Sequence, residues 1–127
     1  MTLELLPKGV EIKLEDGHQR YIFWGIKPIY ELQEMFDKPI EQILNEEMLK
    51  GDDPYGTIAK ILKVLLNDDA RRQKKHGKDI PELDEEYLLE YLDAASCHKL
   101  TRVLIMSFNG TLPKSEEKQQ KNDQSEQ

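Results

Sequence analysis

Apolar and polar positions alternate between residues 10 and 24, which is the period of a β-strand with one buried face. The sequence VEIKL at 10–14 is followed by Asp-Gly at 16–17 and then by RYIFW at 20–24, a run rich in aromatic and β-branched residues. Asp-Gly favours a two-residue type I′ turn, because both of its central residues need positive φ. The pattern therefore predicts an N-terminal antiparallel β-hairpin.

A two-residue turn also sets the register of the predicted hairpin. Ile12 then lies opposite Tyr21, and Val10 lies opposite Phe23. Tyr21 and Phe23 share one face, which we expect the first helix to cover, since a hairpin alone is only marginally stable. Trp24 lies on the opposite face and is expected to be exposed, which makes it a candidate for contact with a partner protein.

Helical periodicity begins after the hairpin. A first helix is predicted from about Pro28 and is interrupted at residues 37–39, because the residue before a proline is pushed out of the helical region. A second helix is predicted over residues 39–49. A third begins at Pro54 with Asp53 as its N-cap, and its long apolar stripe makes it the expected centre of the core.

Two further helices and a polar tail complete the predicted fold. The fourth helix has Asp84 as its N-cap, and the fifth runs from about Ser96 to Asn109-Gly110, a pair typical of a left-handed helix end. Beyond Gly110, residues 113–127 hold too little apolar surface to offset the entropy of ordering them. The sequence thus predicts an α+β fold: a single domain over 1–112, with a two-stranded hairpin and about four to five packed α-helices, and a disordered tail over 113–127.

Composition narrows the classes of function. The chain has 127 residues and a net charge of −7, and an acidic surface repels phosphate backbones, which argues against nucleic acid as the main partner. Its one cysteine cannot form an internal disulfide, so the fold does not depend on an oxidising compartment. We expect no membrane association, because no apolar run approaches the roughly 20 residues that span a bilayer. The first six residues lack the pattern of a secretion signal, so the expected location is the cytoplasm.

Residues that could carry catalysis do not form a recognisable pattern in the sequence. Cys97 and His98 are adjacent, so on a helix they point about 100° apart and cannot act directly as nucleophile and base. The three histidines and the cysteine lack metal-ligand spacings such as CxxC or HExxH. We therefore expect a protein that is not an enzyme, with no catalytic residue, cofactor or metal.

One strong charge run precedes Gly77 and continues just beyond it. It contains Arg71, Arg72, Lys74, Lys75, His76 and Lys78. Such a run is compatible with a solvated helix end whose cations complement the helix dipole, with a contact to an acidic partner, or with nucleic-acid binding. Together with Trp24, its first four members are the candidate partner-binding residues: Arg71, Arg72, Lys74 and Lys75.

Three segments of the sequence resemble the phage tail assembly chaperones. They are VEIKLEDG at 10–17, RYIFW at 20–24 and IYELQEMFDKPI at 29–40. The third segment follows the family pattern Leu-x-Glu-x-Phe-Gly-Lys, with Asp37 where glycine is usual. The resemblance extends from Val10 to Pro113, but the connection around the basic run is longer than is usual in the family.

The resemblance implies a protein made in the bacterial host cytoplasm and absent from the mature virion. It would bind the tape measure protein, keep that protein soluble and aid assembly of the tail tube, with the tail tube protein as a further partner and with self-association. Two alternatives remain open. One is a small acidic regulatory or immunity-type protein that binds a basic partner, and the other is a nucleic-acid binder that uses the basic run.

Overall fold

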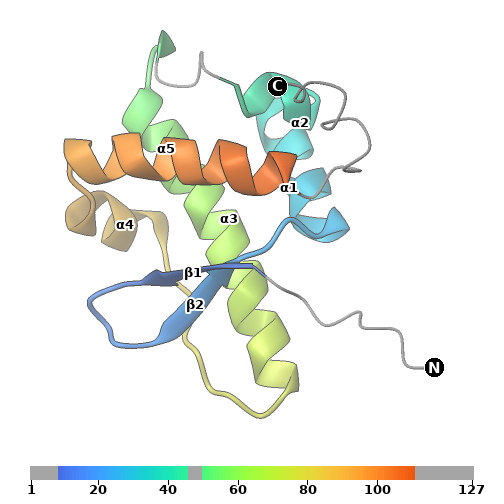
Figure 1. Ribbon diagram of the computed structural model, residues 1–127, viewed down its shortest axis with the longest axis vertical. Helices are drawn as coiled ribbons and strands as arrows, with labels where there is room; N and C mark the ends of the chain where they lie inside the picture. Colours follow the sequence, from blue (N-terminus) through green and yellow to red (C-terminus); the bar gives the residue numbers. More distant parts are fainter. Residues whose placement is uncertain (1–8, 46–49, 111–127) are drawn as a thin grey trace, which may run out of the picture.

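A computed structural model of the protein describes residues 9–45 and 50–110 (Figure 1). Within these ranges an antiparallel hairpin precedes five helices, which confirms the predicted α+β fold. The elements are β1 (Val10–Lys13), β2 (Gln19–Ile22), α1 (Ile26–Phe36), α2 (Ile40–Ile43), α3 (Pro54–Lys75), α4 (Glu85–Tyr91) and α5 (Ala94–Asn109). The predicted tail over 113–127 lies outside the described residues.

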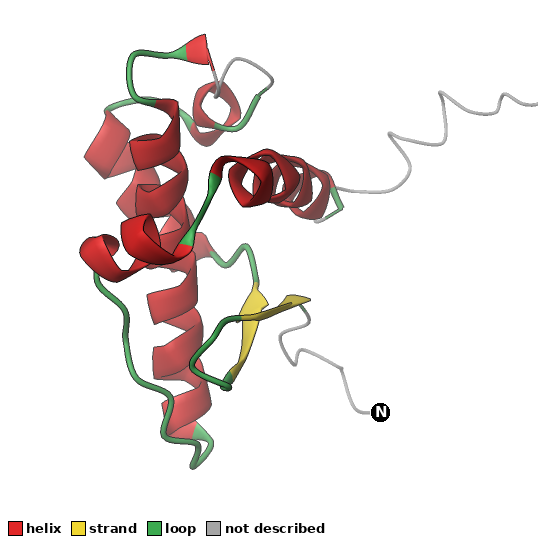
Figure 2. Ribbon diagram, turned by 90° about the vertical axis from the view of Figure 1, so that its left-hand side faces the viewer, coloured by secondary structure: helices red, strands yellow, loops and turns green. Residues whose placement is uncertain are grey.

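Helix α3 forms the centre of the molecule, as its apolar stripe predicts. It runs along the long axis, and α5 and the hairpin lie against the same side of it (Figures 1 and 2). It contacts β2, α1, α4 and α5. Its side chains Ile58, Ile61 and Leu65 are fully buried. Asp53 caps its first turn, accepting a hydrogen bond of 3.1 Å from the Gly56 N–H, as predicted.

Left-handed residues end two of the helices. After α3, Gly77 has φ +89° and donates its N–H to the Lys74 carbonyl oxygen (3.0 Å), while the next residue, Lys78, donates to Gln73 (3.0 Å). This pattern is a Schellman motif. After α1 the same conformation falls on Asp37, with φ 56° and ψ 44°, so the predicted interruption at residues 37–39 is confirmed.

The hairpin is present, but its turn is not the predicted one. Five residues, 14–18, separate the strands, and the Gly17 N–H donates to the Leu14 carbonyl oxygen (3.2 Å). A type I′ turn needs positive φ at both central residues, yet in the Asp-Gly pair only Gly17 has it. Asp16 instead accepts a hydrogen bond from the His18 N–H (3.1 Å), which stabilises the longer loop.

The longer loop shifts the register by one residue, and such a shift moves every side chain of a strand to the other face. Val10 pairs with Ile22, not with Phe23 as predicted. Ile22 and Trp24 are therefore buried, while Tyr21 and Phe23 lie half-buried on the outer face. The predictions that Trp24 is exposed and that α1 covers Tyr21 and Phe23 are both wrong.

Trp24 belongs to the core between the hairpin and α5. Its indole Nε1 donates to the Ser107 hydroxyl (2.9 Å), and its ring meets the Phe108 ring edge-on with centroids 5.4 Å apart. Only 5% of its surface is exposed. A partner protein therefore cannot reach Trp24 without displacing part of α5.

Other helix ends differ from the predictions by small amounts. Helix α1 begins two residues before Pro28. Helix α2 ends at Ile43; within the predicted 39–49 helix, Leu44 and Asn45 are not helical, and residues 46–49 lie outside the described ones. Helix α5 begins at Ala94, before the predicted Ser96, because Asp93 caps it by accepting from the Ser96 N–H (2.8 Å). Gly110 is right-handed and not left-handed, since its N–H continues the helical pattern to Met106. The Asp84 cap of α4 is confirmed.

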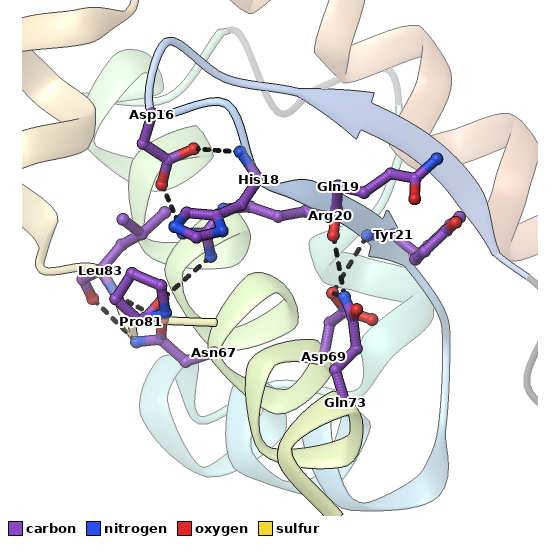
Figure 3. Close-up of polar contacts among 10 residues, drawn as sticks. All are labelled: Asp16, His18, Gln19, Arg20, Tyr21, Asn67, Asp69, Gln73, Pro81 and Leu83. Carbon is purple, nitrogen blue, oxygen red and sulfur yellow. Dashed lines mark hydrogen bonds and ion pairs between the residues drawn. The ribbon is translucent and has the colours of Figure 1, made fainter. Parts of the chain in front are cut away.

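The C-terminal half of α3 carries buried polar side chains that bind neighbouring backbone (Figure 3). The Asn67 amide donates to the Leu83 carbonyl oxygen (2.8 Å) and accepts from the Leu83 N–H (2.7 Å), which attaches the segment before α4. The Asp69 carboxylate accepts from the Tyr21 N–H (3.1 Å), which attaches β2. The sequence pattern did not predict these contacts.

Replacing Asn67 with Ala should lower the free energy of unfolding by about 2 kcal/mol, because both backbone groups of Leu83 lose their partner while staying partly buried. Urea denaturation followed by circular dichroism measures the change. The exposed Asn109→Ala substitution on α5 is the matched control and should change stability by less than about 0.5 kcal/mol. Equal effects of the two substitutions would contradict the assigned role.

Replacing Asp37 with Gly should raise the free energy of unfolding by about 0.5–1 kcal/mol, because glycine adopts the left-handed conformation without a Cβ clash. Asp37→Ala should lower it, since alanine keeps the clash and removes the polar side chain that tolerates this conformation. Thermal denaturation of the two variants and the natural protein gives the order. An Ala variant at least as stable as the Gly variant would contradict the explanation.

Candidate binding surface

A hollow of about 280 Å³ lies between the outer face of β2 and the C-terminal half of α3. We call it the β2–α3 hollow. It is lined by Gly9, Tyr21, Phe23, Asp69, Arg72, Gln73, His76 and Lys78. Aromatic rings from the strand and polar or cationic groups from the helix and its end thus meet at one surface.

The strand and the helix are locked together along this hollow. Gln73 donates from its amide both to the Gln19 carbonyl oxygen (2.9 Å) and to the Asp69 carboxylate (2.8 Å), and Asp69 accepts from Tyr21 (Figure 3). Two side chains one helical turn apart therefore satisfy the backbone groups on the edge of β2 that faces α3. These hydrogen bonds hold β2 in place against α3 on this side of the hollow.

Arg72 joins the two sides of the hollow. Its guanidinium carbon lies 4.5 Å from the centre of the Phe23 ring, in a cation–π arrangement, and its Nε donates to the Asp68 carboxylate (3.0 Å). His76 and Lys78 are exposed at the rim. An anionic or aromatic group could therefore meet the Arg72 guanidinium and the Lys78 ammonium above an aromatic surface.

The five predicted partner-binding residues are not brought together. Arg72 lines the β2–α3 hollow, whereas Arg71 lies outside it and pairs with Glu82 (3.3 Å). Lys74 and Lys75 are exposed in the last turn of α3, where positive charge complements the helix dipole. Trp24 is in the core. Tyr21 and Phe23 were missed because the predicted register placed them inward.

A buried arginine holds the hairpin loop. The Arg20 side chain has no exposed surface, and its guanidinium forms an ion pair with Asp16 (2.5 Å) and donates to the Pro81 carbonyl oxygen (3.0 Å). Burial alone raises the pKa of the Asp16 carboxyl. The hydrogen bonds from Arg20 and from the His18 N–H outweigh that effect and set the pKa below its ordinary value of 3.8.

A second hollow, of about 190 Å³, lies where the start of α3 meets α4 and α5. We call it the α4–α5 hollow. It is lined by Tyr55, Leu89, Leu92, Asp93, Ala94 and Cys97. Leu89 and Tyr55 are large apolar side chains with 49% and 44% of their surface exposed. This hollow therefore presents an accessible and mostly apolar surface.

Cys97 is buried and lines the α4–α5 hollow. Burial, and to a smaller extent the charge of Asp93, raises the pKa of its thiol. A thiol with a raised pKa is a poor nucleophile at neutral pH, since the thiolate is the reactive form. The neighbouring His98 is exposed on another face of α5. The site favours binding over thiol chemistry.

Residues 9–45 and 50–110 contain no group of three His, Cys, Asp or Glu side chains placed to hold a metal ion. Within the same ranges no helix combines the length and the apolar character that crossing a membrane requires. No protein family model matches the sequence, and no curated protein or solved structure matches the chain.

The Asp16–Arg20 ion pair should make stability depend on pH in the acidic range. Because folding lowers the pKa of Asp16, its contribution is present above the ordinary value of 3.8 and is lost as the pH falls through the lower folded value. Asp16→Asn should therefore be less stable than the natural protein at pH 7, with the difference shrinking towards pH 2. Urea denaturation across this range tests it, and a difference independent of pH would contradict it.

Proposed function

We propose that this chain is a non-enzymatic phage tail assembly chaperone that acts in the bacterial cytoplasm, binds the tape measure protein and aids assembly of the tail tube. The order of a hairpin followed by helices agrees with the family that the sequence resembles. The accessible apolar surface of the α4–α5 hollow suits a protein whose client exposes long apolar helices.

The left-handed conformation of Asp37 is the observation that supports the resemblance most directly. The family pattern has glycine at this position, and glycine is the residue that adopts positive φ most easily. Asp37 has φ 56° and ends α1 by donating its N–H to the Gln33 carbonyl oxygen. Aspartate tolerates this conformation better than most residues, so the departure from glycine leaves the local backbone of the pattern intact.

The client surface that we propose is the α4–α5 hollow. A helix with an apolar stripe can place side chains spaced by one turn into an apolar groove. Leu89 and Tyr55 would flank such a helix, and Leu92 would lie beneath it. The β2–α3 hollow suits this client less well, because its rim carries cationic groups.

Substituting Leu89 with Lys should weaken binding of a tape measure fragment at least about tenfold, because it puts a charge into the contact with an apolar helix. Co-expression and isothermal titration calorimetry with a helical fragment measure the change. Met106→Lys is the matched control, since Met106 is an exposed apolar residue of α5 that does not line this hollow. It should bind the fragment as the natural protein does.

Two outcomes would count against the chaperone. A folded sample that binds no tape measure fragment contradicts the proposed client. Binding that falls steeply as salt rises, and that prefers a partner with a basic surface, points instead to an acidic regulatory protein, whose net charge of −7 would steer the encounter. Apolar contacts in the α4–α5 hollow predict only a weak dependence on salt.

A further inference from the structure

The two outer edges of the hairpin differ in whether their backbone groups have hydrogen-bond partners. β2 has β1 on one side and the Asp69 and Gln73 side chains of α3 on the other, so both of its edges are occupied (Figure 3). β1 pairs only with β2 among the described strands. Its Val10, Glu11 and Lys13 side chains are exposed. Within residues 9–45 and 50–110, the open edge of the sheet is therefore β1.

The backbone groups of the open edge can be assigned from the other strand. In an antiparallel pair, two residues directly opposite point their N–H and C=O groups either both towards each other or both away. The Tyr21 N–H and the Gln19 carbonyl oxygen point away from β1, to α3. Their opposite residues are Glu11 and Lys13, so the N–H and C=O groups of these two residues point outward from β1.

We propose that β1 is a self-association edge, at which two copies of this chain pair antiparallel about Ile12. On this axis Glu11 lies opposite Lys13 of the second copy, and Lys13 lies opposite its Glu11. Because Glu11 and Lys13 are the residues whose backbone groups point outward, each of these two pairs exchanges two backbone hydrogen bonds. The two hairpins become a four-stranded sheet, which is more stable than a two-stranded one.

The charges of β1 favour a second copy of this chain as the partner that pairs with this edge. The axis through Ile12 sets each glutamate carboxylate beside a lysine ammonium, and opposite charges on directly opposite residues stabilise a strand pair. A shift of either strand by two residues would remove this match. Exposed Val10, with 42% of its surface accessible, gains apolar cover in the pair, and the half-buried Ile12 meets its own copy. The resemblance implies self-association in general; the edge and the register proposed here are inferred from the geometry and charges of β1 and do not rest on the proposed function.

A charge swap tests the pairing. E11K and K13E each place like charges opposite one another twice in the symmetric pair, so each should weaken dimerisation at least about tenfold. The double variant E11K/K13E exchanges the two charges and should restore dimerisation to near the natural level. Sedimentation equilibrium of the full chain at low salt measures all four proteins, and circular dichroism checks that each is folded.

A proline variant tests whether the outer edge of β1 is needed for dimerisation without disrupting the hairpin itself. The Lys13 N–H points outward and forms no ladder bond with β2, so K13P removes an intermolecular donor while the hairpin keeps its own hydrogen bonds. A folded K13P variant should be monomeric. The proposal is overturned if the natural chain is monomeric at millimolar concentration, if a folded K13P variant remains a dimer, or if the double charge swap does not restore what the single swaps lose. None of these results depends on binding to a tape measure fragment.

Discussion

The hydrogen bonds from the polar side chains of α3 to the backbone of its neighbours hold the rest of the structure in place. Asn67 forms hydrogen bonds with both backbone groups of Leu83. In β2, Asp69 accepts from the Tyr21 N–H and Gln73 donates to the Gln19 carbonyl oxygen. A short hairpin and an irregular segment have few backbone partners of their own, and an unpaired buried backbone group costs about 1–3 kcal/mol. Helix α3 supplies those partners on two of its faces. It therefore forms the centre of the apolar core and also provides the hydrogen bonds that hold β2 and the segment before α4.

Local signals predicted the starts of α3 and α4, because a cap is a contact between residues three apart, but the Asp93 cap of α5 was missed. Asp53 and Asp84, both predicted as N-caps, each accept from the N–H group three residues further on. The hairpin turn is a different case. Asp-Gly favours a two-residue turn in isolation, but in the five-residue loop Asp16 accepts from the His18 N–H and from Arg20. Arg20 also donates to the Pro81 carbonyl oxygen, 61 residues further along the chain, and a local turn pattern does not reveal a contact at that distance.

The β2–α3 hollow follows from the register of the hairpin. Had Tyr21 and Phe23 faced inward, as the two-residue turn required, the β2–α3 hollow would have had no aromatic side. The cationic side of this hollow could be predicted from the charge run, since Arg72 belongs to it. The α4–α5 hollow could not be predicted, because Tyr55 and Leu89 lie among apolar residues of α3 and α4, several of which, such as Ile58 and Leu88, are buried. Periodicity identifies a stripe but does not show which of its members the neighbouring helices leave uncovered.

Arg20 explains why the observed register is the stable one. A buried ion pair adds little net stability, since desolvating both charges offsets their attraction, but a buried charge without its partner costs several kcal/mol. Arg20 reaches Asp16 and the Pro81 carbonyl oxygen from the inner face of β2. A slip of one residue moves Arg20 to the outer face and separates these groups, and it also exposes Ile22 and Trp24. The arginine thus contributes specificity more than stability: it ties the loop, the strand and the segment before α4 to one register, and that register sets which residues the hairpin leaves for a partner.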